Sequence, residues 1–265
     1  MSDLRRLTLA DLRRKRAAGE ALVAVSLYDA CFARLADASV DIILVGDSLG
    51  MTVLGHGSTV PVTLDDMVSA TAAVVRGSRQ AFIVADLPFG TYQASPAQAL
   101  ESSVRMLRAG AQAVKMEGGA FLVPQVELLV RSGIPVMGHI GVLPQSVNIS
   151  GYRAKGRDAA ELRLLQEDAA ALQQAGAFSL VMECVSAEAA ATLSAGLDIP
   201  TIGIGSGLGC SGQIQVMHDI LGLDENFLPR HAQRFAELGR LGCDAFAAYA
   251  EAVKTRQFPT AGNTY

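Results

Sequence analysis

Ionisable side chains stand at the ends of short apolar runs in this chain, and they recur at equivalent points of different runs. The set comprises four carboxylates, one lysine and one histidine: Asp47, Asp86, Lys115, Glu117, His139 and Glu183. Ser48 adds a hydroxyl group directly after Asp47. A single acid after a strand is often only a helix N-cap or a member of a surface ion pair. Recurrence at equivalent points indicates instead that these side chains share one site.

Four carboxylates and a lysine in one cavity would repel one another or pair wrongly unless a cation neutralised them. Carboxylate oxygens without a thiolate cluster suit Mg²⁺ or a similar hard cation. Such an ion would keep coordination positions for a chelating substrate, and an α-keto acid offers both a carboxylate and a ketone oxygen. The ion would polarise the ketone and acidify the neighbouring C–H group, from which a further carboxylate could remove the proton. The residues alone therefore indicate metal-assisted carbon-acid chemistry on an unnamed substrate.

The apolar runs predict eight strands that alternate with stretches of helical periodicity. The strands are expected at Val23–Leu27, Asp41–Val45, Phe82–Ala85, Ala113–Met116, Ile134–Met137, Phe178–Met182, Pro200–Ile204 and Ile214–Met217. Most of them are apolar on both faces, as in a parallel sheet that is covered on both sides. The clearest helices are expected at Asp65–Arg76, Pro96–Ala109, Ala120–Arg131 and Asp158–Ala175.

Eight strands with intervening helices predict a (β/α)₈ TIM barrel, whose usual size of about 250 residues suits a chain of 265. A doubly wound open sheet is the alternative, although no GxGxxG motif follows the first strand. We expect a single barrel domain over 1–265, because no Pro- or Ser-rich linker divides the chain. An extra N-terminal helix at about 8–18 is expected to close the barrel bottom, and a C-terminal helix at about 229–254 to join the outer ring. In such a barrel the strand ends converge on the C-terminal rim, where active sites are built.

Composition excludes several classes of protein. Hydrophobic residues make up 50% of the chain and charged residues 18%, which excludes an intrinsically disordered protein. A net charge of −4 disfavours a nucleic-acid partner. No apolar run approaches the roughly 20 residues that span a bilayer, and the N-terminus lacks the apolar core of a secretion signal. Because four scattered cysteines suit neither a disulfide framework nor a zinc site, we expect reduced thiols and a cytoplasmic protein.

Longer stretches around these residues form a collinear set. They read VGDSLGM at 45–51, LGHGSTVPVTLDDM at 54–67, VADLPFG at 84–90, AVKMEGG at 113–119, IPVMGHIGVLPQSV at 134–147, AGAFSLVMECV at 175–185, IPTIGIGSGLGCSGQ at 199–213 and HDILGL at 218–223. Through them the chain resembles the ketopantoate hydroxymethyltransferase (3-methyl-2-oxobutanoate hydroxymethyltransferase) family. A lone GHIG would be weak evidence, whereas an ordered set that covers most of the chain is highly specific.

The resemblance implies transfer of a hydroxymethyl group from 5,10-methylenetetrahydrofolate to 3-methyl-2-oxobutanoate. The product would be 2-dehydropantoate, a step of pantothenate biosynthesis, formed through a Mg-stabilised enolate with one Mg²⁺ per subunit. It further implies a homo-oligomer, a decamer of two pentamers, that takes small-molecule substrates and binds neither nucleic acid nor membrane. A different metal-dependent barrel enzyme that acts on keto-acid enolates, of the phosphoenolpyruvate mutase/isocitrate lyase type, is the alternative.

The resemblance also assigns roles by motif position. Asp47 and Asp86 would bind the metal, with Glu117 as a third ligand or just behind them. The keto acid would contact Asp47, Ser48, Asp86, Lys115 and His139, and Tyr28 would lie at the end of the first strand. Glu183 matches the proton acceptor, for which a pKa raised toward neutral would serve. Ser211 stands where relatives commonly carry Asp, which is expected to remove a charge near the rim after the seventh strand.

Overall fold

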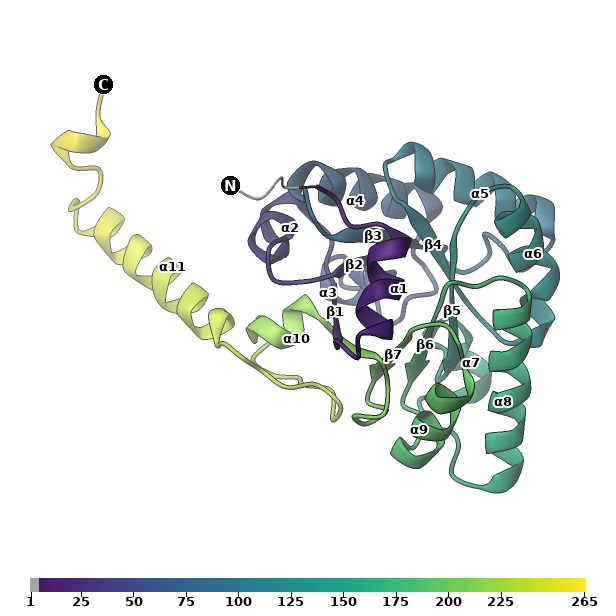
Figure 1. The fold of residues 1–265 in the computed structure, drawn as a ribbon. Helices are drawn as coiled ribbons and strands as arrows, with labels where there is room; N and C mark the ends of the chain where they lie inside the picture. Colours follow the sequence, from purple (N-terminus) through teal and green to yellow (C-terminus); the bar gives the residue numbers. More distant parts are fainter. Residues whose placement is uncertain (1–4) are drawn as a thin grey trace. The chain divides into compact units, whose positions relative to one another are not determined.

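The computed structural model describes residues 5–265, with the side chain of Ser150 left aside. Within these residues eight parallel strands close into a barrel in the order of the sequence (Figure 1). The strands are β1 (Leu22–Ser26), β2 (Ile42–Val45), β3 (Phe82–Asp86), β4 (Ala113–Glu117), β5 (Val136–Gly141), β6 (Ser179–Glu183), β7 (Thr201–Ile204) and β8 (Gly212–Val216). Strand β1 pairs with both β2 and β8, which closes the sheet. The predicted (β/α)₈ barrel is confirmed.

Helices surround these strands on the outside of the barrel (Figure 1). They are α2 (Ala30–Ala36), α4 (Leu64–Gly77), α5 (Pro96–Arg108), α6 (Val123–Arg131), α8 (Ala159–Gln174) and α9 (Ala187–Gly196). Helix α1 (Leu9–Ala17) precedes the first strand, and the short helices α3 (Leu49–Thr52) and α7 (Val147–Ser150) lie within connections. Their starts follow local chemistry, since Ser95 caps α5 ahead of Pro96, and Thr63 with Asp66 forms a capping box on α4. The four helices that the sequence predicted most clearly are all present.

Alternate residues of the strands point into the barrel and form its core. The buried cluster comprises Leu12, Leu22, Ala24, Ile42, Leu44, Phe82, Val84, Ala113, Met137, Phe178, Val181, Ile202 and Ile214. Because side chains alternate between the two faces of a strand, residues two or four positions beyond a core residue also face inward. This rule places Asp86 beyond Val84, and Glu183 beyond Val181. The apolar core and the ionisable set therefore occupy the same interior, one above the other.

The N-terminal helix closes the bottom of the barrel, as expected. Leu12 of α1 is only 1% exposed and belongs to the barrel core together with Leu22, the first residue of β1. Burial of one such leucine contributes about 1.5–3 kcal/mol. The start of α1 is fixed by a capping box between Thr8 and Asp11, and Asp11 also pairs with Arg14 at 2.8 Å.

The connection between β7 and β8, residues 205–211, contains no helix, so intervening helices are not found throughout the barrel. Its glycines explain the local path. Gly207 and Gly209 approach α9 so closely that an added Cβ atom would come within 2.7 Å of the Cβ atoms of Ala187 and Ala191. The glycines here serve close packing against a helix.

Residues 217–265 form a second compact unit with helices α10 (Met217–Leu221) and α11 (Leu238–Lys254). The C-terminal helix begins at Leu238, whereas the sequence predicted a start at about 229. Residues 1–216 form the other unit, and the single domain over 1–265 stays a prediction. Among the described residues, no helix is long and apolar enough to cross a membrane.

Candidate active site

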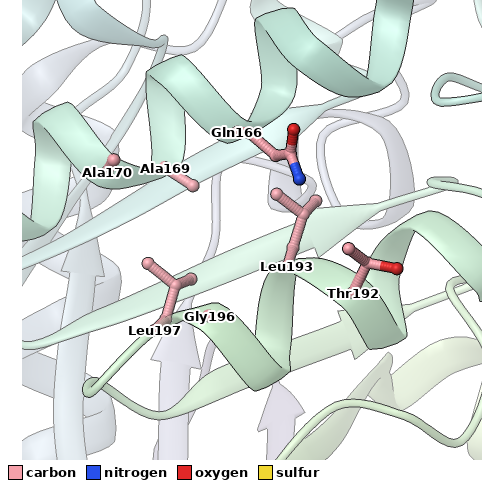
Figure 2. Close-up of a pocket in the computed structure, with 7 residues that line it drawn as sticks. All are labelled: Gln166, Ala169, Ala170, Thr192, Leu193, Gly196 and Leu197. Carbon is pink, nitrogen blue, oxygen red and sulfur yellow. The ribbon is translucent and has the colours of Figure 1, made fainter. Parts of the chain in front are cut away.

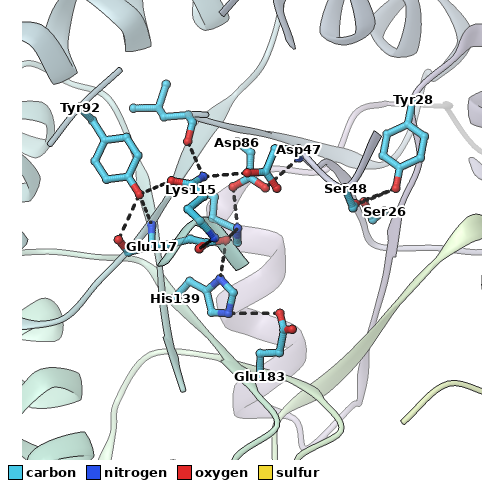
Figure 3. Close-up of polar contacts among 12 residues, drawn as sticks. Ser26, Tyr28, Asp47, Ser48, Asp86, Tyr92, Lys115, Glu117, His139 and Glu183 are labelled. Atoms are coloured by element: carbon cyan, nitrogen blue, oxygen red, sulfur yellow. Dashed lines mark hydrogen bonds and ion pairs between the residues drawn. The ribbon is translucent and has the colours of Figure 1, made fainter. Parts of the chain in front are cut away.

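The ionisable residues that the sequence singled out come together at the C-terminal ends of the strands (Figure 3). Asp86, Glu117 and Glu183 are the last residues of β3, β4 and β6, and His139 lies inside β5. The sequence had placed these residues just after the strands, because their polarity ended each apolar run. The ladder continues through them, since neighbouring strands still pair there, as Glu117 does with His139.

Lys115 lies between two of the carboxylates. Its Nζ atom is 2.6 Å from Asp86 Oδ1 and 3.6 Å from Glu117 Oε1, and its side chain is only 4% exposed. Burial acts to lower the pKa of Lys115, but the charges of Asp86 and Glu117 outweigh it and raise the pKa above its ordinary value. The charged ammonium form of Lys115 is therefore favoured at the centre of the site.

Asp47 is the carboxylate whose negative charge is least offset by its surroundings. Burial raises its pKa well above the ordinary value, and the negative charges of Asp86 and Glu117 raise it further. Its backbone N–H donates to Asp86 Oδ2 at 3.3 Å, which joins the two acids directly. The preceding Gly46 lies close to the hydroxyl groups of the site, because a Cβ atom there would come within 2.7 Å of Ser26 Oγ.

We call Asp47, Asp86, Lys115 and Glu117 the central group. In its other two acids, Asp86 and Glu117, the effect of burial on the pKa and the opposing effect of Lys115 differ in their outcome. Burial raises the pKa of Asp86, and Lys115 only partly opposes that change. Burial acts in the same direction on Glu117, yet Lys115 and His139 outweigh it and the pKa of Glu117 is lowered. Glu117 is therefore ionised, while Asp47 and Asp86 are the acids that burial and repulsion disfavour as anions.

The donor set suits a hard cation at Asp47 and Asp86. Their carboxylates are buried and destabilised by each other's charge, and a divalent ion beside them would offset both effects. Among residues 5–265, no group of three or more His, Cys, Asp or Glu side chains is arranged to hold a metal ion. Glu117 has other partners, because its Oε2 atom accepts from the Gln145 backbone at 3.0 Å and its Oε1 atom faces Lys115. These contacts favour the reading in which Glu117 lies behind the metal ligands.

His139 lies between Glu117 and Glu183 (Figure 3). Its Nδ1 atom is 3.4 Å from Glu117 Oε1, and its Nε2 atom is 3.5 Å from Glu183 Oε2. Neither contact has hydrogen-bond geometry in the described structure. The ring thus separates the acid of the central group from the acid that the sequence assigned as the base.

Glu183 has the pKa that a base needs near neutral pH. Its side chain is 16% exposed. Burial raises the pKa of Glu183 to about 7, and His139 opposes part of that rise. The expected rise toward neutral is therefore found, and its main cause is loss of contact with water.

The backbone around Glu183 is held on both sides. Cys184 adopts the left-handed region with φ 49°, which is uncommon outside glycine. Its N–H group donates to Ile204 O at 2.8 Å, and its carbonyl oxygen accepts from Lys155 N at 3.0 Å. These bonds to neighbouring segments keep the strained turn in place and so fix the direction of the Glu183 side chain.

Ser48 forms a hydroxyl cluster with Ser26, the last residue of β1, and with Tyr28. The Tyr28 hydroxyl group is 2.7 Å from Ser48 Oγ, and Ser26 Oγ lies 3.3 Å from the same atom. Tyr28 lies just beyond β1, as the sequence predicted, and it is 5% exposed. Ser26 escaped notice because a serine inside an apolar strand carries no charge pattern.

Gln145 and Tyr92 also belong to the site, although the sequence reasoning did not select them. The Gln145 side chain donates to Asp47 Oδ2 at 2.8 Å, and the Tyr92 hydroxyl group donates to Gln145 Oε1 at 2.7 Å. Both residues are neutral, so a search for ionisable groups passes over them. The available signal was the position of Gln145 in the stretch 134–147.

The expectation for Ser211 is wrong. Its carbonyl oxygen accepts from Leu22 N at 2.9 Å, and its Oγ atom lies 3.3 Å from Thr201 Oγ1. Leu22 and Thr201 are the first residues of their strands, so Ser211 lies at the bottom of the barrel and not at the rim. The reason is the path of residues 205–211, which return to the bottom of the barrel before β8 begins.

A pocket of about 230 Å³ lies elsewhere in the barrel unit, between α8 and α9 (Figure 2). Its lining residues are Gln166, Ala169, Ala170, Thr192, Leu193, Gly196 and Leu197. None of them carries a charge, and none belongs to the site described above.

Comparisons with known proteins identify the family of the chain. The profile of the family described as ketopantoate hydroxymethyltransferase matches residues 6–261. The 3-methyl-2-oxobutanoate hydroxymethyltransferase of Chloroflexus aurantiacus is 55% identical over 256 residues, which are 96% of this chain and 91% of that protein. The protein of the same name from Chloroflexus aggregans is 56% identical over the same shares of the two chains.

A solved structure shares the fold at low sequence identity. The crystal structure of 2,3-dimethylmalate lyase, a member of the PEP mutase/isocitrate lyase superfamily, aligns with a TM-score of 0.59 and 18% identity. The alignment covers 97% of this chain and 91% of the lyase. This likeness concerns the barrel alone, whereas the family profile and the close relatives concern the whole sequence. The chain belongs to the ketopantoate hydroxymethyltransferase family.

Proposed function

We propose that this chain transfers a hydroxymethyl group from 5,10-methylenetetrahydrofolate to 3-methyl-2-oxobutanoate. With one water molecule consumed, the products are tetrahydrofolate and 2-dehydropantoate, a step of pantothenate biosynthesis. The observation that carries this proposal is the pairing of a buried base with a buried cation in one site. Glu183 has a pKa of about 7, and Lys115 stays charged among the carboxylates.

Glu183 accepts the proton from C3 of the keto acid. A carboxyl group with a pKa near the working pH is ionised in a large share of molecules and is still basic enough to remove a weakly acidic proton. The turn at Cys184 keeps the carboxylate aimed at the site. His139, 3.5 Å from Glu183, lines the path between the base and the central acids.

Lys115 and the hydroxyl cluster bind the other end of the keto acid. As C3 loses its proton, negative charge develops on the ketone oxygen, and a fixed ammonium group stabilises that charge. Ser48 Oγ, oriented by Tyr28 at 2.7 Å, offers a hydrogen bond to the substrate. Asp47 and Asp86 would hold the Mg²⁺ ion, with Glu117 behind them; when bound, the ion acts as a Lewis acid toward the keto acid.

Isotope exchange tests the proposal directly. The protein is incubated with 3-methyl-2-oxobutanoate in deuterated water, with and without Mg²⁺ and with and without methylenetetrahydrofolate. We expect Mg²⁺-dependent deuterium uptake at C3, and 2-dehydropantoate only when folate is present. Uptake without any folate-dependent product would favour a different keto-acid enolate enzyme, of the phosphoenolpyruvate mutase/isocitrate lyase type. No uptake under any condition would refute both.

The family resemblance extends the proposal to assembly and location. We infer a cytoplasmic homo-oligomer, a decamer of two pentamers with one Mg²⁺ per subunit, that takes only small-molecule substrates. Light scattering on the purified protein measures the number of subunits, and a monomer would contradict the assembly.

A further inference from the structure

Gln145 makes contacts to two acids of the site, although it has no acid–base chemistry of its own. It lies in the 3₁₀ helix Pro144–Ser146, directly beyond β5, and is 4% exposed. We propose that Gln145 is a positioning residue, which holds Asp47 and Glu117 in place for the cation and the keto acid, and that Tyr92 fixes the orientation of its amide. The inference rests on the proposed function, because it concerns the same site.

The side-chain amide of Gln145 uses all of its hydrogen-bonding capacity. Its Nε2 atom has two hydrogens, and it donates to Asp47 Oδ2 at 2.8 Å and to Leu87 O at 2.9 Å. Its Oε1 atom accepts from the Tyr92 hydroxyl group at 2.7 Å and from Gln93 Nε2 at 3.4 Å. A rotated amide would set Oε1 against two acceptors, so one orientation is strongly favoured. In that orientation a donor faces the carboxylate of Asp47.

Tyr92 and Gln145 form a closed ring of hydrogen bonds with Glu117. The Glu117 backbone N–H donates to the Tyr92 hydroxyl oxygen at 3.1 Å, and that hydroxyl group donates to Gln145 Oε1. The Gln145 backbone N–H then donates to Glu117 Oε2 at 3.0 Å. Since each link is buried, the ring fixes both the backbone and the carboxylate of Glu117.

Gln145 therefore joins residues that follow or end neighbouring strands of the barrel. Asp47 follows β2, Leu87 follows β3, Glu117 ends β4, and Gln145 itself follows β5. Asp47 stands beside two like charges, so it needs a donor that keeps its carboxylate turned toward the cation position. A neutral amide supplies this donor without adding a further charge to the site.

Binding of Mn²⁺ to the intact protein tests this role without reference to turnover. Groups that orient the ligands of a metal ion change its affinity by about 10- to 100-fold when they are removed. Gln145→Met keeps the length of the side chain and removes both donors, and we expect it to weaken Mn²⁺ binding by about 10- to 100-fold. Tyr92→Phe removes only the hydroxyl group that orients the amide, and we expect a smaller loss, below about tenfold. Titration followed by electron paramagnetic resonance gives the dissociation constants.

Gln125→Met is the matched control. Gln125 is also a buried glutamine, and its Nε2 atom donates to the backbone oxygen of Tyr92 at 3.4 Å and, among the described residues, to none of the acids. We expect Mn²⁺ binding within about twofold of wild type. Circular dichroism and thermal unfolding establish that each variant is folded. If Gln145→Met is not folded, the Mn²⁺ affinity of Tyr92→Phe tests the proposal.

The outcomes separate this inference from the proposed function. Folded Gln145→Met or Tyr92→Phe protein with wild-type Mn²⁺ affinity would overturn the positioning role, and so would wild-type protein that binds no Mn²⁺ at 10 mM (roughly ten thousand times a dissociation constant of about 1 μM). An equal loss in Gln125→Met would reduce the effect to general packing and would also overturn it. Wild-type protein that binds Mn²⁺ with an affinity that falls in folded Gln145→Met, but that exchanges no deuterium at C3, supports the positioning role and refutes the transferase.

Discussion

Replacing Glu183 with glutamine should remove the activity and make the protein more stable at the same time. The substitution keeps the shape of the side chain and removes its charge. In the structure this carboxyl group is buried beside His139, and burial raises its pKa from an ordinary value of 4.5 to about 7. The ionised form that catalysis needs is therefore the form that folding disfavours.

The size of this effect follows from the two pKa values. The folded protein holds the Glu183 proton more tightly than the unfolded chain, so the free energy of unfolding falls as the pH rises from about 4.5 to about 7 and is then constant. Each pKa unit corresponds to about 1.4 kcal/mol, which gives a total loss of about 3 kcal/mol above neutral pH. Glutamine does not titrate, so the free energy of unfolding of the variant does not fall in this way.

Urea denaturation at pH 5 and pH 8 measures the difference. Relative to wild type, Glu183→Gln should gain about 2–3 kcal/mol more at pH 8 than at pH 5, while deuterium uptake at C3 disappears and the keto acid still binds. Glu127→Gln, an exposed position on α6, is the control and should show no such pH dependence. An advantage of Glu183→Gln that is equal at both pH values would refute the argument that burial disfavours the charge. Retained exchange would remove Glu183 as the base.

Other measurements test neighbouring parts of the site. For wild type, kcat/KM for deuterium exchange should rise with pH through about 7 and then level off, because Glu183 must be ionised; a flat profile between pH 5 and 9 would contradict this. Lys115→Met leaves Asp86 buried without its partner, so unfolding measurements should show a loss of about 3–5 kcal/mol together with loss of exchange. Asp86→Ala should weaken Mg²⁺ binding, and calorimetry that returns wild-type affinity would exclude it as a ligand. Ser211→Asp should leave exchange kinetics within about twofold of wild type, because that residue lies at the bottom of the barrel and surface-like changes far from a site have small effects.

The fold was predictable because strand burial and side-chain alternation are both local properties of the sequence. A run such as Phe82–Asp86 is apolar up to the point where its last residue turns polar, and that change marks the barrel rim. The ends of β3, β4, β5 and β6 were placed too early, because a polar residue was taken to end the strand. In β5 the backbone ladder continues to Gly141, since hydrogen bonding between strands does not depend on side-chain polarity.

The central acids of the site were predictable from charge, but their partners were not. Lys115 and Glu183 stand out in an apolar context, so their positions in the sequence are sufficient. Gln145 and Tyr92 are neutral side chains whose hydrogen-bond partners lie in other connections of the barrel, at separations of 53 and 98 residues along the chain. Nothing in the local pattern distinguishes such a glutamine from one on a solvated loop.

The structure also refines why the site needs a cation. In the sequence, four carboxylates stand against one lysine, which indicates that something must neutralise them. Glu183 contributes less than a full negative charge, because with a pKa of about 7 much of it is protonated near neutral pH. If Asp47, Asp86 and Glu117 are all ionised, they set three negative charges against the one positive charge of Lys115, which leaves two, and burial and repulsion disfavour that state at Asp47 and Asp86. A divalent ion would cancel these two negative charges, whereas a second lysine would cancel only one. The raised pKa of Asp47 marks the position at which such an ion would stabilise the carboxylate.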